Sequence, residues 1–380
     1  MSVPLPRLAA AAAALVASLA LAAPGPPALA AVPATATRAA PTRAAASTVL
    51  QSVAAVSKSD AWAVGSLIAH WNGRRWSKVR GARTRKCAVQ LNGVAARSAS
   101  LAWAVGYCGT LRSHRPVIER WNGRHWRVQS SPRTAASALS QLNSVTATSR
   151  SSAWAVGEYT SKGRTLPLLE RWNGRAWKIQ ASPDPSPHGA ELFGVTALSA
   201  RSAWAVGSSL DATEAPSLTL IEHWNGHRWH TQPSINPGSQ NFLVDVTALT
   251  GRRAWAAGFY TFGSNTGTLV ESWDGTSWQE PATPGPGLHV ALLGIAAHSA
   301  SDVWTVGLRS SLTNPRTLVQ HWNGTTWKVV SSPSPSPHPD ALEGVAVLSR
   351  ASAWAVGFRG NKTLIERWNG KAWAVQSSPN

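Results

Sequence analysis

The stretch ERWNGRAW, residues 170–177, places two tryptophans five positions apart around an Asn-Gly pair, and variants of it recur along the 380-residue chain. A second phrase, AWAVG at 153–157, recurs with it. The first tryptophans of these phrases follow one another in steps of 41, 51, 50, 51, 49 and 50 residues, at Trp62, Trp103, Trp154, Trp204, Trp255, Trp304 and Trp354. The chain therefore contains seven repeats of about 50 residues.

Each repeat also carries a later pair of tryptophans. These pairs are Trp71/Trp76, Trp121/Trp126, Trp172/Trp177, Trp224/Trp229, Trp273/Trp278, Trp322/Trp327 and Trp368/Trp373. Three tryptophans in each of seven repeats account for all 21 in the chain. Indole faces also stack on sugars, but a position present in every repeat favours packing over ligand binding, because each buried indole contributes a large apolar area.

Each repeat predicts four short strands. In the fourth repeat these are LFGVTAL (192–198), AWAVG (203–207), LTLIEHW (218–224) and RWHTQ (228–232). Length and β-branched content favour strands over helices. Asn-Gly at 225–226 is expected to close the last hairpin with two adjacent residues at positive φ.

Alternation along the second strand predicts how the repeats pack. In AWAVG at 153–157, Trp154 and Val156 point to one face, whereas the two alanines and the glycine point to the other. Sheets with one bulky and one small face can stack in a ring, so we predict an all-β, seven-bladed β-propeller with four antiparallel strands per blade. The domain is expected at 48–380, with repeats at about 49–80, 88–131, 140–182, 190–233, 241–281, 290–332 and 340–378.

These repeats resemble those of Kelch and galactose-oxidase propellers, in which a hydrophobic strand ends at glycine and a pair of aromatics follows. SWDGTSW at 272–278 resembles the Asp-box hairpin of sialidase-like propellers. The resemblance covers residues 49–378, but Kelch repeats carry two consecutive glycines where this chain has one, and no WD40 pattern is present.

The resemblance implies two kinds of active site, and neither is complete in the sequence. A sialidase-like site requires a tyrosine nucleophile with its glutamate, an aspartate and three arginines, yet no spacing gives Tyr107, Tyr159 or Tyr260 a partner. A galactose-oxidase-like copper site requires a cysteine linked to a tyrosine. Scattered histidines such as His188, His289 and His338 do not predict a metal site. We therefore predict no catalytic residues, no metal and no cofactor.

A glutamate precedes the second tryptophan in most repeats. It is Glu119, Glu170, Glu222, Glu271 or Glu366, with Gln320 in the sixth repeat and Ala69 in the first. Such recurrence indicates a structural role, since catalysis needs a carboxylate pair only once. Glu170 is expected opposite Trp177, where its carboxylate accepts the indole N–H or meets an arginine.

The amino terminus predicts export. A short basic segment, an apolar run at 8–23 and the small-residue site ALA at 28–30 are typical of a secretory signal peptide over residues 1–30. The alternative is an Ala-rich disordered tail. Residues 31–47 are expected to be a flexible linker, and no second apolar run is long enough to span a membrane. We predict a secreted, extracellular protein.

The two cysteines lie in the second repeat. Cys87 precedes its first strand and Cys108 follows its second, so antiparallel pairing brings them to one end of the blade. An extracellular location favours a disulfide between them. Free buried thiols are the alternative.

The chain is strongly basic, with 36 Lys and Arg against 17 Asp and Glu. Such a surface attracts polyanions, although most of these charges are also spread as on any solvated surface. One dense run, Arg74, Arg75, Lys78, Arg80, Arg83, Arg85 and Lys86, predicts a site for an anionic polymer. No nucleic-acid reading motif is present.

Loop lengths predict where a ligand binds. The turns between first and second strands and the Asn-Gly hairpins are short in every repeat, whereas the other connections vary and emerge at the opposite rim. The ligand-binding candidates in these variable loops are Arg85, Tyr107, Tyr159, Lys162, Asp184, His188, Asp211, Glu214, Tyr260, Arg309, His338, Asp340 and Arg359. Unconstrained drift of the loops is the alternative explanation.

The function predicted from these features is a non-catalytic binding propeller for an extracellular glycan, an anionic cell-wall polymer or a protein. The alternative is a glycan-cleaving propeller enzyme. The chain is expected to be a monomer whose ring closes without strand exchange, with residues 49–56 and 372–377 in adjacent blades.

Overall fold

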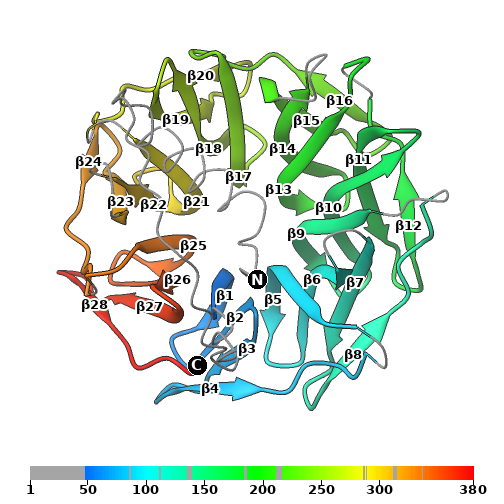
Figure 1. Ribbon diagram of the computed structural model, residues 1–380, viewed down its shortest axis with the longest axis horizontal. Helices are drawn as coiled ribbons and strands as arrows, with labels where there is room; N and C mark the ends of the chain where they lie inside the picture. The colour runs from blue at the N-terminus through cyan, green and yellow to red at the C-terminus, as the bar shows by residue number, and fades with distance from the viewer. Residues whose placement is uncertain are drawn as a thin grey trace, which may run out of the picture.

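The computed structural model describes residues 48–84, 87–110, 113–134, 139–183, 186–210, 216–285, 287, 289–310, 315–335 and 337–380. Within them the chain forms seven four-stranded antiparallel sheets around a central axis (Figure 1). Each sheet uses four consecutive strands, and the described residues contain no helix. The predicted seven-bladed, all-β propeller is confirmed.

Strands occupy four equivalent positions in the blades, from the axis outward. The innermost strands are β1 (Leu50–Ser57), β5 (Val89–Ser98), β9 (Ser140–Ser149), β13 (Ala190–Ser199), β17 (Gln240–Thr250), β21 (Val290–Ser299) and β25 (Asp340–Ser349). The second strands are β2 (Asp60–Gly65), β6 (Leu101–Thr110), β10 (Ser152–Ser161), β14 (Ser202–Leu210), β18 (Arg253–Phe262), β22 (Asp302–Arg309) and β26 (Ser352–Arg359). The third strands are β3 (Ile68–Trp71), β7 (Ser113–Trp121), β11 (Arg164–Trp172), β15 (Pro216–Trp224), β19 (Asn265–Trp273), β23 (Arg316–Trp322) and β27 (Lys362–Trp368). The outermost strands are β4 (Trp76–Val79), β8 (Trp126–Gln129), β12 (Trp177–Gln180), β16 (Trp229–Gln232), β20 (Trp278–Gln279), β24 (Trp327–Val329) and β28 (Trp373–Val375).

Tryptophans join neighbouring blades. The ring of Trp154 in blade 3 lies 5.0 Å from Trp224 and 4.9 Å from Trp229 in blade 4. Trp154 and Val156 share one core cluster with the alanines of β14. The predicted packing of a bulky face into a small one is confirmed.

The ring closes by the same contact. Trp354 of blade 7 lies 4.9 Å from Trp71 and 5.1 Å from Trp76 of blade 1, and β1 and β28 belong to separate, adjacent blades (Figure 1). The backbone N–H of Thr48 also donates to the carbonyl of Asn361. As expected, the described strands show no exchange between the first and last blades.

The hairpins between third and fourth strands differ from the prediction. Trp172 pairs with Trp177 across a four-residue loop, and within it only the glycine, Gly174, has a positive φ, of 93°. The Oδ1 atom of Asn173 accepts the N–H groups of Arg175 and Ala176, both at 3.0 Å. Adjacent residues at positive φ were wrongly expected, because Asn-Gly opens a four-residue loop capped by the asparagine side chain and does not form a two-residue turn.

The recurring glutamate is structural, but its partner differs from the prediction. Glu170 pairs in register with Ile179, not with Trp177, whose indole N–H has no hydrogen-bond partner among the described residues. The Glu170 carboxylate instead accepts the Ser131 hydroxyl at 2.7 Å, from the linker that arrives from blade 2. Equivalent bonds join Ser182 to Glu222, Ser234 to Glu271 and Ser332 to Glu366. Each such carboxylate fastens the linker from the preceding blade.

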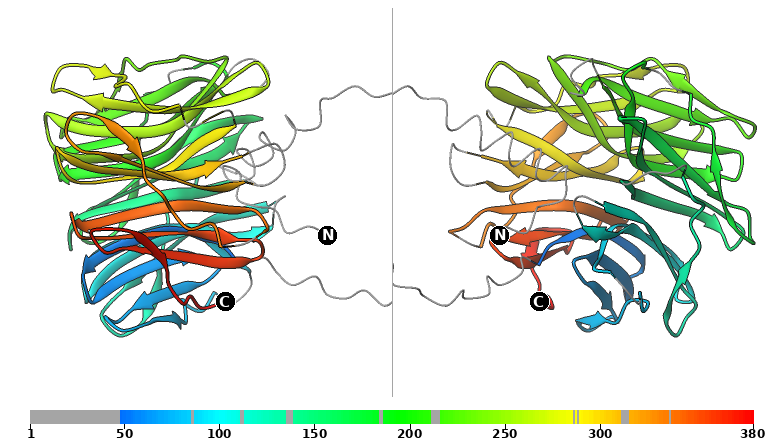
Figure 2. Two further views of the ribbon diagram at one scale, coloured as in Figure 1. Left: turned by 90° about the vertical axis from the view of Figure 1, so that its left-hand side faces the viewer. Right: turned by 45° about the vertical axis from the view of Figure 1, so that its right-hand side comes forward.

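The two rims of the disc have different construction (Figure 2). One, the hairpin rim, consists of the turns between first and second strands, such as 150–151, and the four-residue hairpins, such as 173–176. The other, the loop rim, consists of the second-to-third strand connections and the linkers between blades. Up-and-down strand order places each set at its own end of every blade.

Candidate functional site

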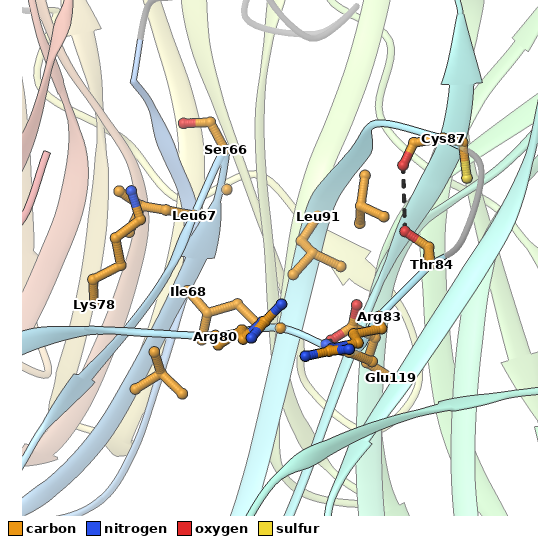
Figure 3. A pocket seen from close by; sticks show the side chains of 15 residues that line it. Ser66, Leu67, Ile68, Lys78, Arg80, Arg83, Thr84, Cys87, Leu91 and Glu119 are labelled. Atoms are coloured by element: carbon orange, nitrogen blue, oxygen red, sulfur yellow. Dashed lines mark hydrogen bonds between the residues drawn. The ribbon is translucent and has the colours of Figure 1, made fainter.

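A hollow opens on the loop rim between blades 1 and 2. Strands β2 and β3 have six and four residues, whereas the equivalent β10 and β11 have ten and nine. Blade 1 therefore has no extended hairpin beside blade 2, and a hollow of about 640 Å³ remains (Figure 3). Its wall includes 65–68 and 78–79 of blade 1, linker residues 80–84, and Glu119 of blade 2.

Three cations surround this hollow. The side chain of Lys78 reaches the hollow from β4, and those of Arg80 and Arg83 reach it from the linker that follows (Figure 3). All three are exposed, whereas Leu67 and Leu91 beneath them are buried. The hollow thus combines an apolar floor with a positive rim, which suits an anionic ligand that has a carbon skeleton.

Glu119 holds the linker that carries the arginines. Its Oε2 accepts the backbone N–H of Ala82 at 2.9 Å. Burial raises the pKa of Glu119, and this hydrogen bond opposes the rise. A Cβ atom at Gly81 would lie 3.3 Å from that carboxylate oxygen, so glycine permits the close approach. The backbone between Arg80 and Arg83 is therefore held in place by Glu119.

The far end of the linker is also fixed. Cys87 and Cys108 form a disulfide with their Cα atoms 5.6 Å apart, which joins the linker to β6. The Thr84 hydroxyl donates to the carbonyl of Cys87 at 3.3 Å (Figure 3). Both ends of the segment behind the hollow are therefore held by contacts within the protein.

The dense basic run of the sequence divides between the two rims. Arg74 and Arg75 lie in the four-residue hairpin of blade 1, at the hairpin rim. Lys78, Arg80 and Arg83 face the hollow. Arg85 and Lys86 lie outside the described residues.

Three further candidates from the variable loops, Asp184, Asp211 and Glu214, also lie outside the described residues. Tyr107, Tyr159 and Tyr260 lie within β6, β10 and β18 and are half-buried. Tyr159 and Tyr260 pack against the core clusters between neighbouring blades. The ring of Tyr107 lies 4.8 Å from that of His114. Their contacts are those of packing side chains.

The remaining candidates are spread over blades 3, 4, 6 and 7. Exposed side chains are those of Lys162, His188, Arg309 and His338, whereas Arg359 is half-buried and Asp340 is buried. None of these candidates lines the hollow between blades 1 and 2. Loop variability alone did not indicate the hollow, but the short first step of 41 residues in the repeat was its signal.

The described part of the chain lacks two further features. No three or more His, Cys, Asp and Glu side chains there are grouped so as to hold a metal ion. Within those same ranges, no helix has the length and apolar character needed to cross a membrane.

Comparisons with known proteins support the fold. No protein-family description and no curated protein matches the chain. Solved structures of similar shape include YCF48 bound to D1 peptide, at 14% identity over 85% of this chain and 92% of that chain, with a TM-score of 0.56. A GH74 xyloglucanase from Xanthomonas campestris matches at 11% identity over 88% of this chain and 55% of that chain, with a TM-score of 0.59. A PL25 ulvan lyase bound to -[GlcA(1-4)Rha3S]- matches at 9% identity over 88% and 96%, with a TM-score of 0.56.

These similarities extend to a shared propeller fold and no further. The neighbours include a protein captured with a peptide and enzymes that act on polysaccharides. Because one fold serves such different activities, the function of this chain has to be argued from its own site.

Proposed function

We propose that this protein is a non-catalytic binding propeller whose hollow between blades 1 and 2 takes an anionic segment of an extracellular glycan or cell-wall polymer. The observation that carries this proposal is the convergence of Lys78, Arg80 and Arg83 on one hollow. Carboxylate, sulfate and phosphate groups are the natural partners of such cations.

The linker beside the hollow is already ordered before a ligand binds. Glu119 and the Cys87–Cys108 disulfide hold the linker from both sides, so little backbone order remains to be lost on binding. The overall excess of Lys and Arg over Asp and Glu attracts a polyanion from a distance. The ulvan lyase, a propeller of similar shape, also binds a polysaccharide fragment.

Hydrolysis of a glycosidic bond requires two suitably placed carboxyl groups. Glu119 is the one carboxyl among the described residues that line the hollow, and it is buried against a backbone N–H. This composition supports binding over cleavage.

Secretion is part of the proposal. It is supported by the signal-peptide pattern at 1–30, which lies outside the described residues, and by the disulfide, which is typical of oxidising compartments.

The test is a hollow variant with Lys78→Gln, Arg80→Gln and Arg83→Gln. Its affinity for a chondroitin sulfate tetrasaccharide, measured by calorimetry, is expected to fall about tenfold or more, because three charge-assisted contacts are lost. The matched control changes three exposed cations of the outer strands, with Arg127→Gln, Lys178→Gln and Lys328→Gln, and is expected to bind within about twofold of the parent, since distant exposed charges are screened.

Equal losses in the two variants would reject a localised site. If changing Lys162, Arg309 and Arg359 to glutamine weakened binding more than the hollow variant did, the ligand would lie in the variable loops. Release of new reducing ends from a polysaccharide would instead establish the glycan-cleaving alternative.

A further inference from the structure

The hairpin rim, opposite the proposed ligand hollow, is strongly positively charged. The residue after the hairpin glycine, or the one that follows it, is an exposed cation in five blades: Arg74, Arg124, Arg175, Arg228 and Lys371. With Arg75 and the cations of the neighbouring turns, these turns and hairpins hold eleven Lys and Arg residues and one carboxylate.

The turns between first and second strands supply the second set of cations. These are Lys58, Arg150, Arg201, Arg252 and Arg350, and all are exposed. Because every turn of this kind lies at the same rim as the hairpins, the cations form an arc over most of the disc. Blade 6 is the gap, since its turn and hairpin contain only neutral side chains, Thr325 among them.

The turns and hairpins of this rim hold only one carboxylate, which offsets a small part of their positive charge. This carboxylate, Asp274, accepts the hydroxyl of Thr276 at 2.6 Å and two backbone N–H groups, and these bonds lower its pKa to about 2. Asp302, at the edge of the rim, accepts His321 and the indole of Trp304. No carboxylate in the described ranges forms an ion pair with a rim arginine. Uncompensated charge of one sign on one face is the electrostatic footprint of a polyanion partner.

Cations also converge where blades meet at this rim. Arg120 lies over the rings of Trp103 and Trp172, and burial together with the charge of Arg150 lowers its pKa. Arg171 occupies the equivalent place one seam further on, over Trp154 and Trp224. Like charges held close together are stabilised by an anion placed between them.

A hollow of about 500 Å³ lies beside Arg171, between blades 3 and 4. Its wall includes Arg171, Asn173 and the hydroxyl side chains of Ser149, Ser151 and Ser199. Guanidinium and hydroxyl groups are the donors that bind phosphate and sulfate. The exposed Arg150, Arg175 and Arg201 belong to the turns and hairpins around it.

We propose that the hairpin rim is a second binding face, for a linear polysaccharide that carries phosphate or sulfate groups, with one such group held in the hollow between blades 3 and 4. The large exposed apolar side chains, Val128, Ile179, Leu218, Phe262 and Val329, lie in strands and not in the turns or hairpins of this rim. The face therefore binds by charge and does not insert into a lipid surface. This proposal does not depend on the ligand of blades 1 and 2.

The test compares a rim variant with a control of equal charge. The rim variant carries Arg124→Gln, Arg150→Gln, Arg175→Gln and Arg201→Gln, and the control carries Lys162→Gln, Arg309→Gln, Lys328→Gln and Lys362→Gln, all exposed and outside the turns and hairpins of the rim. The probe is dextran sulfate in about 100 mM NaCl, where contacts beyond roughly 10 Å are screened. We expect the rim variant to bind about tenfold more weakly and the control to change by less than about threefold.

A gain-of-charge variant keeps the test independent of any loss of folding. Thr325→Lys places in blade 6 the residue that blade 7 has as Lys371, and it is expected to strengthen dextran sulfate binding by about twofold to threefold. Equal weakening of rim variant and control would overturn the proposal, because net charge would then explain the binding. Failure of the parent to bind dextran sulfate, or preference for phosphatidylglycerol vesicles over it, would overturn it as well.

Discussion

The seam between blades 1 and 2 and the seam between blades 3 and 4 have the same aromatic core but different linkers. Trp62 lies 4.8 Å from Trp121, much as Trp154 lies 5.0 Å from Trp224. At the second seam the Ser182 hydroxyl donates to Glu222 at 2.6 Å. At the first, Gly81 replaces that serine.

The difference shows which part of the repeat is free to change. With glycine at 81, the Glu119 carboxylate accepts a backbone N–H and lines a hollow, whereas Glu222, which is buried to the same degree, accepts the hydroxyl of Ser182. The aromatic contact is the same in both places because it holds the blades together. The linker can therefore vary, and a ligand site can arise there without loss of the ring.

The largest expected effect tests the shared core. Trp62→Ala and Trp154→Ala should each destabilise the fold by about 3–5 kcal/mol, because each removes a fully buried indole and leaves a cavity. Thermal unfolding of both variants measures this. A melting temperature equal to the parent's in one variant but not in the other would show that the two seams do not depend on the same contact.

A smaller effect concerns the pH dependence of stability at the glutamates beneath the two linkers, Glu222 and Glu119. Burial raises the pKa of Glu222 to about 8, against the hydrogen bond from Ser182, which lowers it. The folded state therefore favours the protonated acid, and the stability that this provides is complete below the unfolded pKa of about 4.5 and is lost as the pH rises through about 8.

Glu222→Gln should therefore stabilise the fold at about pH 8 by roughly 1–3 kcal/mol and flatten the decline of melting temperature between about pH 5 and pH 8. Gln320 already fills this position in blade 6, where its amide donates to the carbonyl of Pro284. Glu119→Gln is the comparison, and its effect should be smaller because that carboxylate borders the hollow. An unchanged pH profile in the Glu222 variant would contradict the assignment.

The smallest expected effect concerns the cation over the indoles. Arg171 lies 5.3 Å from the ring of Trp154 and 5.2 Å from that of Trp224, whereas the ring of His70 lies 4.2 Å from that of Trp62, in a tilted arrangement, in the first seam. Arg171→Gln should cost about 0.5–1 kcal/mol, because a cation–π contact at a partly exposed site is lost. Lys328→Gln, which removes an exposed charge from β24 in blade 6, is the control for denaturant unfolding. Equal midpoints in the two variants would mean that the stacked cation adds no stability.

The sequence predicted the blades accurately because their contacts are local and repeated. Strand order, the face of Trp154 and the closure of the ring all follow from alternation within a strand and from the 50-residue period. The partner of Glu170 could not be predicted in this way. Ser131 is 39 residues away in another blade, and only the path of the linker brings the two together.

The ligand hollow also combines features that the sequence predicted with one that only the tertiary structure decided. Chain order places Lys78, Arg80 and Arg83 in one basic run with Arg74 and Arg75, yet the run crosses the disc and its two halves face opposite rims. Periodicity, pairing and the tryptophan positions were readable because each depends on neighbours in the chain. Which charges share a surface depends on how the linkers cross between blades, and packing between distant residues sets that path.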